Sequence, residues 1–359
     1  MKKVLLVCPA LPEDMPYLRQ YIDFLDNHDV LYDLAYMSFS CNRDLYPDNY
    51  EAFVKSTITN NIILKLWEYY AFSRFIIRKL SKGTYTHVIT MGIASSIFIA
   101  LYLKRNFKNK YIYDIRDYSR VLNVPVIKYF NKVLLKNSYL NVISSGGFKV
   151  WLPTGVEYVL SHNTTKDKIN DSISYVSNQD YTGLIKILTI GQLRDYDANL
   201  YVINQLCNNS KYELIFSGKG MTMKSLENYA KAKSYSNVLF TGKYKKEDED
   251  KIADHASFIN VCMGDNVLSN YLLSNRLYLA ARLKKPLISF DGSYQSEIIN
   301  KYNLGLIIKR TDDLSTELQN YINSLDYKAF IHNCDAFLED VRKDIQLFQD
   351  RLESFIESV

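Results

Sequence analysis

The chain has 359 residues, of which 47% are hydrophobic and 23% are charged. This length predicts about two domains, and this balance excludes an intrinsically disordered chain, a collagen-like chain and a polytopic membrane protein. The net charge of +5 is uneven: residues 1–170 carry 22 Lys and Arg against 14 acids, and residues 171–359 carry 22 against 25. The five cysteines form no C-x-x-C pair, which predicts neither a zinc site nor a disulfide framework.

Short apolar runs rich in Val, Ile and Leu recur along the chain, each followed by an amphipathic segment of helical length. This alternation predicts parallel sheets covered by helices on both faces. The strands expected in the first half are Val4–Cys8, Val30–Tyr36, His87–Met91, Tyr111–Ile115, Leu140–Ser144 and Tyr158–Leu160. Those expected in the second half are Ile185–Ile190, Tyr212–Ser217, Asn237–Thr241, Phe258–Cys262, Pro286–Phe290 and Gly305–Ile308.

A polar segment at 163–183, rich in Asn, Asp, Ser and Lys, separates the two series. We therefore predict an α/β protein with two doubly wound parallel-sheet domains, at 1–166 and 184–335, joined by a linker at 167–183. A C-terminal amphipathic helix is predicted at 336–359, and it either covers the first domain or packs only on its own domain. Its apolar face is formed by Phe337, Val341, Ile345, Phe348, Leu352 and Phe355.

Several catalytic motifs are absent from the sequence. No G-x-G-x-x-G follows the first strand, and no G-x-x-x-x-G-K-[ST] occurs, which disfavours dinucleotide oxidoreductases and P-loop NTPases. H-E-x-x-H and G-x-S-x-G are absent too, which disfavours the hydrolases that carry them. The uncharged stretch from Gly83 to Leu103 predicts a strand at His87–Met91 and a helix from about Ser95, rather than a membrane span.

Ligands of open parallel sheets bind beyond the carboxyl ends of the strands, so the segments after the second-domain strands are candidate sites. Gly191 lets the backbone turn after the first of these strands, and Arg194 is placed there to reach an anion. Alternatively, Arg194 pairs with Asp195 or Asp197. The turns Gly218-Lys219-Gly220 and Gly242-Lys243-Tyr244 end the next two strands.

Ser274 or Asn275 is expected to cap a helix that ends near Lys284. The N-terminus of a helix presents free N–H groups and partial positive charge to a phosphate. Arg276 adds a full charge in the first turn, where a cation is unfavourable unless an anion offsets it. The alternative is a solvated arginine.

Several of these segments resemble one enzyme family. The run SNRLYLAARLKKPLIS resembles the N-K-L-x-E-x-x-A-x-G-K-P-V-I signature of GT-B glycosyltransferases, in particular the family-4-like enzymes of bacterial capsule and exopolysaccharide clusters. IGQLR, FSGKGM and FDGSYQSEIINKYNLGLII resemble the donor-domain turns and the segment after the signature strand. KYIYDIRDYSR and YVLSHNTT resemble the family's first-domain strand end and interdomain segment.

The resemblance implies two Rossmann-like domains facing a cleft, with a nucleotide-diphosphate sugar in the second and an acceptor in the first. It places the diphosphate at Gly191, Arg194, Lys219, Ser274, Asn275 and Arg276, and the base and ribose at Gly218, Gly242, Lys243, Tyr244 and Leu279. The donor sugar would lie at Gly264, Asp265 and Asn266. The catalytic residues would be Asp114, Asp117 and Arg194.

The implied activity is hexosyl transfer, with retention favoured over inversion, to a glycan linked to a polyprenyl diphosphate in surface polysaccharide biosynthesis. Cations and a helix N-terminus can stabilise the leaving diphosphate, so we expect no cofactor and no metal. Asp117 or Asp114 would accept the acceptor proton if the reaction inverts. Alternatively, both aspartates are ion-pair partners of Arg116 and Arg120.

Two positions depart from the family pattern. Tyr271 and Leu279 occupy the places of a Glu-x7-Glu pair whose second glutamate holds the ribose hydroxyls. A catalytically silent relative that serves another transferase is therefore an alternative, and a sugar-nucleotide epimerase of the same fold is a second one.

The segment Leu64–Lys82 mixes aromatic and basic residues in the pattern of a helix that lies on anionic lipid. We therefore predict a cytoplasmic protein that is peripheral at the inner face of the cell membrane. No nucleic-acid-binding motif is present, so nucleic acid is not expected as a partner. Alternatively, the aromatic residues are core and the basic ones only solvated. The residues expected to face the membrane are Lys65, Trp67, Arg74, Arg78 and Lys79.

Overall fold

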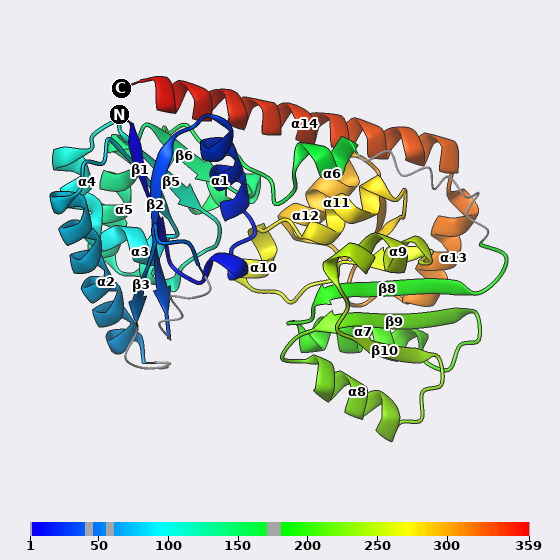
Figure 1. Cartoon of the computed structure of the whole chain (residues 1–359). Helices are drawn as coiled ribbons and strands as arrows, with labels where there is room; N and C mark the ends of the chain where they lie inside the picture. The colour runs from blue at the N-terminus through cyan, green and yellow to red at the C-terminus, as the bar shows by residue number, and fades with distance from the viewer. Residues whose placement is uncertain (1, 40–45, 55–60, 171–180, 359) are drawn as a thin grey trace. The chain divides into compact units, whose positions relative to one another are not determined.

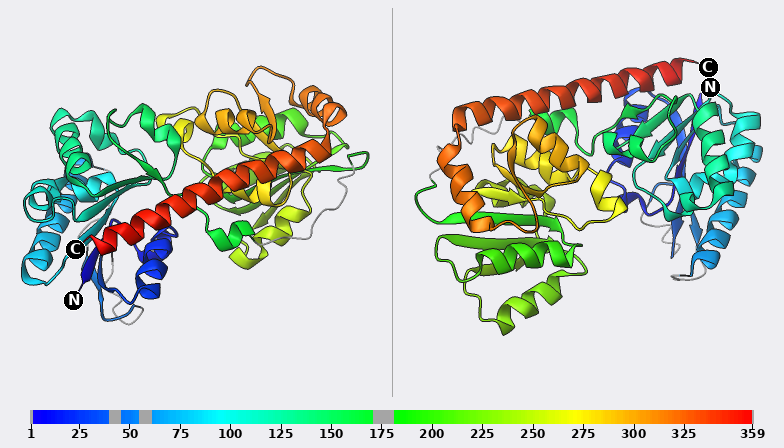
Figure 2. Two further views of the ribbon diagram at one scale, coloured as in Figure 1. Left: turned by 90° about the horizontal axis from the view of Figure 1, so that it is seen from above. Right: turned by 180° about the vertical axis from the view of Figure 1, so that it is seen from behind.

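The computed structural model describes residues 2–39, 46–54, 61–170 and 181–358. They form two compact units, Met1–Thr165 with Asp344–Val359 (unit 1) and Lys166–Lys343 (unit 2). Each unit contains one sheet of parallel strands (Figure 1). The helix α14 (Tyr327–Glu357) begins in unit 2 and ends in unit 1, and Figure 2 shows it as one continuous helix.

The described strands of unit 1 form a seven-stranded sheet in the order β3-β2-β1-β4-β5-β6-β7. The order reverses between β1 and β4, which makes the carboxyl edge of this sheet a place for ligands. The strands are β1 (Lys3–Cys8), β2 (Leu31–Ser38), β3 (Tyr50–Val54), β4 (His87–Met91), β5 (Tyr111–Ile115), β6 (Leu140–Ile143) and β7 (Val159–Leu160).

Helices cover both faces of this sheet. On one face, α1 (Leu18–Asn27) and the end of α14 pack in one core cluster with the strands, through side chains such as Tyr21 and Phe355. On the other face lie α2 (Ile62–Lys82), α3 (Ile93–Ser96), α4 (Ala100–Asn106) and α5 (Pro125–Asn137), with the 3-10 turn η3 (Ile97–Ile99) between them. Further 3-10 turns are η1 (Pro12–Asp14), η4 (Arg120–Asn123) and η5 (Gly146–Val150).

Unit 2 has a six-stranded sheet in the order β10-β9-β8-β11-β12-β13. Its strands are β8 (Ile185–Gln192), β9 (Tyr212–Lys219), β10 (Val238–Gly242), β11 (Phe258–Asn260), β12 (Leu287–Phe290) and β13 (Gly305–Ile308). Its helices are α6 (Lys166–Asn170), α7 (Tyr196–Leu206), α8 (Met223–Ala232), α9 (Glu249–Asp254), α10 (Val267–Tyr271), α11 (Asn275–Arg282), α12 (Tyr294–Lys301) and α13 (Leu314–Ser324), with η6 at Lys246–Asp248. Side chains of α7, α8 and α13 share one buried cluster with the strands.

The predicted fold class is confirmed, because both sheets are parallel, lie between helices and are followed by a helical C-terminus. Each of the twelve predicted strands occurs; the sequence analysis missed β3. The stretch from Gly83 to Leu103 forms β4 and then α3, η3 and α4, as predicted, although the first helical residue is Ile93. None of the described helices combines the length and the apolarity that a membrane-spanning segment requires. Part of the predicted linker, residues 171–180, lies outside the described residues.

Candidate functional site

The carboxyl ends of β8 and β9 lie against each other through two glycines. Gly191 (φ 96°) and Gly218 (φ 140°) are paired across the two parallel strands. A Cβ atom on Gly218 would lie 1.9 Å from the carbonyl oxygen of Gly191, so a side chain does not fit there. Next to Gly191 the edge is open, because the nearest atom to a Cβ at that position would be the Tyr244 hydroxyl oxygen, 3.9 Å away.

Arg276 places a guanidinium group at this open edge. Its Nε donates to the carbonyl of Ile190 at 2.6 Å, and its two terminal nitrogens donate to Asn260 and Gln192 at 3.2 Å each. Among the described residues Arg276 has no ion-pair partner. Burial lowers the pKa of Arg276 to about 10, so the side chain stays charged at neutral pH. The helix α11 begins at this point, with the Ser274 hydroxyl accepting from the backbone N–H of Arg276 at 3.3 Å.

Arg194 supplies a second cation at the same edge. Its side chain is exposed and donates to the Gln192 side-chain oxygen at 2.6 Å. Its ion pair with Asp195 or Asp197, the alternative drawn from the sequence, does not occur among the described contacts. Burial is the largest influence on the pKa of Arg276, and Tyr244 and Asp195 act next, in the opposite direction. The charge of Arg194 lowers the same pKa, so the two guanidinium groups lie within electrostatic reach.

Tyr244 reaches over the edge from the turn after β10. Its hydroxyl donates to Glu249 at 2.9 Å, and Lys246 bonds the same carboxylate. Burial, and then the charge of Glu249, raise the pKa of Tyr244, so the phenol stays protonated and donates. Glu249 is therefore a carboxylate at the predicted base and ribose site that the sequence analysis missed.

The loop after β11 borders the same edge. A Cβ on Gly264 would lie 2.7 Å from a carboxylate oxygen of Asp195, which places this loop against the turn after β8. The side chain of Asn266 accepts from two backbone N–H groups of α10 and so caps that helix. Asp265 accepts from the Asn270 side chain at 2.9 Å. A role for Asn266 in holding a sugar would therefore fall to its backbone.

The other predicted residues of unit 2 divide into two groups. Lys219, Asn275 and Lys243 are exposed, and Gly242 has open space around it at a φ of 76°. Lys219 and Gly242 end β9 and β10, Lys243 follows β10, and Asn275 begins α11. The prediction for Leu279 is wrong, because its side chain is only 5% exposed, lies in the core and has no polar atom for a ribose hydroxyl.

The prediction that Asp114 faces an acceptor is also corrected. Its side chain is fully buried and forms two bonds of 2.7 Å with the guanidinium of Arg116, and the Tyr21 hydroxyl donates to it at 2.7 Å. Burial alone would lower the pKa of Arg116, but the Asp114 carboxylate raises it. Arg116 also donates to the backbone and hydroxyl of Ser161. Asp117 is exposed at the end of β5, where its acceptor role stays a prediction.

The residues predicted to face a membrane are separated along α2. Lys65, Trp67, Arg74 and Arg78 are exposed. Lys79 is not available to a lipid, because it lies 2.6 Å from Glu51 and 3.8 Å from Asp33 and is largely buried by these pairs. For the four exposed residues, contact with a membrane stays a prediction.

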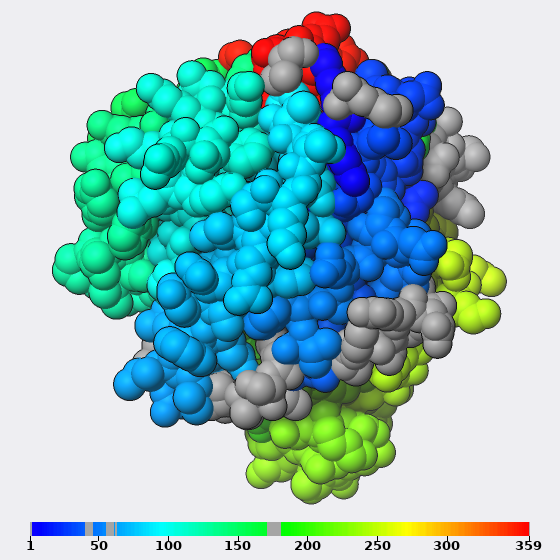
Figure 3. All heavy atoms as spheres, turned by 60° about the vertical axis from the view of Figure 1, so that its left-hand side comes forward, coloured from blue at the N-terminus to red at the C-terminus, as the bar shows by residue number. Residues whose placement is uncertain are grey.

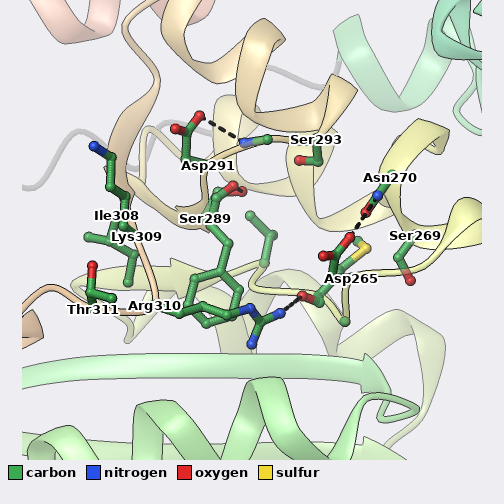
Figure 4. Close-up of a pocket in the computed structure, with 15 residues that line it drawn as sticks. Asp265, Ser269, Asn270, Ser289, Asp291, Ser293, Ile308, Lys309, Arg310 and Thr311 are labelled. Carbon is green, nitrogen blue, oxygen red and sulfur yellow. Dashed lines mark hydrogen bonds between the residues drawn. The ribbon is translucent and has the colours of Figure 1, made fainter.

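A pocket of about 380 Å³ lies beyond the carboxyl ends of β11, β12 and β13 (Figure 4). Arg310 lies 4.1 Å from the centre of the Phe290 ring and donates to the carbonyl of Met263 at 3.0 Å. Asp265 lines the same pocket. The sequence analysis did not single out Arg310, although it follows β13 and the rule applied to the earlier strands would have found it.

Among the described residues, no group of three or more His, Cys, Asp or Glu side chains is arranged to hold a metal ion. The site offers instead guanidinium groups, a helix N-terminus and glycine backbone, which are donors suited to an anionic ligand.

No protein-family model and no curated protein matches the sequence. Solved structures match the fold along the whole chain. A trehalose-6-phosphate protein from E. coli bound with UDP-2-fluoro glucose is 11% identical, with a TM-score of 0.72 over 100% of this chain and 99% of that one. Sucrose-phosphate synthase from Thermosynechococcus elongatus is 13% identical, with a TM-score of 0.70 over 99% of both chains. Anabaena Alr3699/HepE in complex with UDP is 12% identical, with a TM-score of 0.68 over 99% of this chain and 100% of that one. The chain thus has the fold of GT-B glycosyltransferases.

Proposed function

We propose that the protein is a glycosyltransferase that uses a nucleotide-diphosphate sugar as its donor and binds it at the carboxyl edge of the sheet of unit 2. The observation that supports this most is Arg276, a charged guanidinium held by three backbone carbonyls and by no ion-pair partner among the described residues. Carbonyl dipoles orient the guanidinium without neutralising it as a paired carboxylate would, so the group keeps a positive charge for a bound anion. Two of the structural neighbours were solved with UDP or a UDP-sugar, which is consistent with such a ligand.

The chemistry follows from the charges at this edge. In transfer, the bond between the sugar C1 and the β-phosphate oxygen breaks and a bond from C1 to an acceptor oxygen forms. The proton of the acceptor hydroxyl passes to the leaving diphosphate if the configuration is retained, or to a carboxylate if it inverts. The negative charge that develops on the leaving diphosphate is stabilised by Arg276, by Arg194 and by the N–H groups at the start of α11. The hydroxyl of Tyr244 and the carboxylate of Glu249 would contact the nucleoside part of the donor.

The acceptor we propose is a glycan linked to a polyprenyl diphosphate, in the synthesis of a surface polysaccharide, at the cytoplasmic face of the membrane. This part follows from the resemblance of the sequence and from the exposed apolar and basic side chains of α2. Asp117, exposed after β5, is the residue to accept the proton if the configuration inverts. The resemblance favours retention over inversion, in hexosyl transfer.

Nucleotide binding tests the proposal directly. The purified protein is titrated with UDP, GDP, CMP and dTDP by calorimetry and thermal shift, with and without Mg²⁺. We expect one diphosphate to bind, and Arg276→Gln and Arg194→Ala each to weaken it about 10- to 100-fold, the effect of one bond to a charged group. Arg282→Ala is the matched control, because Arg282 lies at the far end of α11 and pairs with Asp250.

A second candidate function is a catalytically silent protein that serves another transferase. It is favoured by Leu279, whose buried aliphatic side chain stands where the related enzymes place a ribose-binding glutamate. If no nucleotide binds, or if Arg276→Gln binds as well as the wild type, the transferase proposal is overturned in favour of this candidate.

A further inference from the structure

Unit 1 exposes several large apolar side chains, and eight of them lie at one edge. The apolar edge, as we name it, comprises the first half of α2, the start of α5 and the end of η5. Its exposed members are Ile63, Leu64, Trp67, Tyr70, Val124, Val126, Tyr129 and Val150. Trp67 is 65% exposed, Ile63 71% and Val150 68%, so most of each side chain is open to solvent.

The topology of the sheet explains why these residues share an edge. The strands are parallel, so every helix on the sheet starts at its carboxyl edge and ends at its amino edge. The end of α2 lies at the amino edge, because Lys79 pairs with Asp33 near the start of β2. Its first half therefore lies toward the carboxyl edge. The start of α5 and the turn η5 follow β5 and β6 and lie at the same edge.

Length explains why the first half of α2 is uncovered. This helix has 21 residues and extends about 30 Å, whereas the five residues of β4 extend about 17 Å. The second half of α2 packs on the sheet, with Phe72 fully buried and 5.6 Å from Phe53 of β3. In the first half, Tyr70 contacts Phe98 of η3 with one side of its ring at 6.1 Å, and Trp67 contacts Tyr70 at 5.5 Å.

The edge is also basic. In the segments 61–74, 117–132 and 146–152 there are six Lys and Arg residues against two acids, Glu68 and Asp117. All six cations are exposed: Lys65, Arg74, Arg120, Lys128, Lys132 and Lys149. Figure 3 shows α2, α4 and α5 side by side on one continuous face of this unit. Apolar and aromatic side chains interleaved with cations are the pattern of a surface that inserts into an anionic membrane.

We propose that the apolar edge of unit 1 docks on an anionic lipid bilayer, with the first half of α2 and the start of α5 entering the interface and the six cations contacting the headgroups. This deepens the proposed function, since a lipid-linked acceptor would then be met at the same edge. It also moves the contact predicted from the sequence, because the end of α2 is excluded by the ion pairs of Lys79.

The chain carries its own reporter for this contact. Trp67 and Trp151 are its two tryptophans, and Trp151 packs on Phe148 with a ring distance of 5.1 Å. The variant Trp151→Phe leaves Trp67 alone. On vesicles of phosphatidylcholine with about 30 mol% phosphatidylglycerol, we expect its emission to shift to the blue and to be quenched by brominated lipid chains. Vesicles of phosphatidylcholine alone should bind far more weakly.

Flotation of the full chain with the same vesicles measures the affinity of each variant. Lys65→Gln with Lys128→Gln should lower the partition coefficient roughly 30-fold, since each cation near an anionic surface contributes a factor of about five. Lys104→Gln with Lys108→Gln is the control, because it removes the same charge from the amino edge of the sheet and should change binding little. Ile63→Ser with Leu64→Ser should weaken binding at least tenfold, and its thermal midpoint shows whether the fold is kept.

Each of three results would overturn the inference. The first is that anionic vesicles leave the Trp67 emission unchanged, and the second is that the edge pair (Lys65→Gln with Lys128→Gln) and the control pair lower vesicle binding equally. The third is that light scattering shows a dimer which Ile63→Ser with Leu64→Ser abolishes, while the protein does not bind vesicles. Nucleotide binding is measured without vesicles. A protein that binds a nucleotide and ignores vesicles therefore refutes the membrane edge and leaves the proposed function standing.

Discussion

Removing the carboxylate of Asp114 distinguishes a structural role of this residue from a catalytic one. The Asp114 side chain is 0% exposed and that of Arg116 is 4%, so Asp114→Ala leaves a buried guanidinium without its counter-charge. In the wild type the Asp114 carboxylate holds the pKa of Arg116 above its usual value against the effect of burial. The variant loses this support, so the buried guanidinium either stays charged without a partner or gives up a proton, and both outcomes cost free energy. Breaking one side of a buried ion pair costs about 3–5 kcal/mol, and the bond from Tyr21 is lost as well.

A double-mutant cycle isolates the pair. Arg116→Met removes the other charge and by itself leaves Asp114 buried and unpaired, which should cost a similar amount. The double variant, Asp114→Ala with Arg116→Met, removes both charges and leaves neither buried alone. Its loss of unfolding free energy should therefore be at least about 2 kcal/mol smaller than the sum of the losses in the two single variants. Asp117→Ala, an exposed carboxylate three residues along the chain, is the matched control and should cost less than about 1 kcal/mol.

The assay is urea unfolding followed by tryptophan emission. Trp67 and Trp151 both belong to unit 1, so emission reports this unit alone even when unit 2 unfolds separately. The reasoning is refuted if Asp114→Asn, which keeps the shape and removes the charge, unfolds at the wild-type urea concentration. If that variant also loses sugar transfer while still binding the nucleotide, Asp114 acts in the reaction.

Two further predictions concern the cores of the units. Burial, with smaller effects of Lys2 and Lys110, lowers the pKa of His87 from 6.5 to about 4. Between these two pKa values the unfolded chain takes up a proton at His87 and the native state does not. The free energy of unfolding therefore falls as the pH drops below 6.5, and at pH 5 it should be about 2 kcal/mol lower than near pH 7. His87→Asn should remove this part of the pH dependence, which is measured by urea unfolding of the wild type and the variant near pH 7 and pH 5. An equal pH dependence in the wild type and the variant would contradict the prediction. In unit 2, Gly218→Ala places a Cβ 1.9 Å from a backbone oxygen and should cost about 3 kcal/mol or more in a thermal or urea midpoint, whereas Gly242→Ala, which has open space at a φ of 76°, should cost about 1 kcal/mol. Equal costs would show that the strands separate freely at Gly218.

The strands were predictable because a buried parallel strand is a continuous apolar run, and a run such as Val4–Cys8 has few other ways to fold in a soluble chain. The missed strand, β3, shows the limit of this signal. It is five residues long, pairs on one side with β2, and has no fully buried residue. Its formation depends on the neighbour that it pairs with, which lies outside the local pattern.

The candidate site was predictable in its location and less so in its members. Strand ends and turns identified the segments around Gly191 and Arg276, because the rule depends on chain topology alone. What each side chain does there depends on partners far along the chain. Asp114 is bonded by Tyr21, 93 residues away, and Lys79 by Glu51, 28 residues away. Neither partner is visible in the motif that contains the residue.

The two buried arginines at strand ends differ in a way that decides where an anion binds. In unit 1, Arg116 faces the full charge of Asp114 at 2.7 Å, so the pair is close to neutral and offers a phosphate little. In unit 2, Arg276 is held by carbonyl groups and has no ion-pair partner among the described residues, although the charge of Asp195 acts on it, and Arg194 adds a second positive charge nearby. Although unit 1 carries more positive charge overall, the cations of its apolar edge are on exposed side chains in water, where each attraction is screened. The nucleotide should therefore bind to unit 2, and unit 1 should receive the acceptor hydroxyl and the lipid surface.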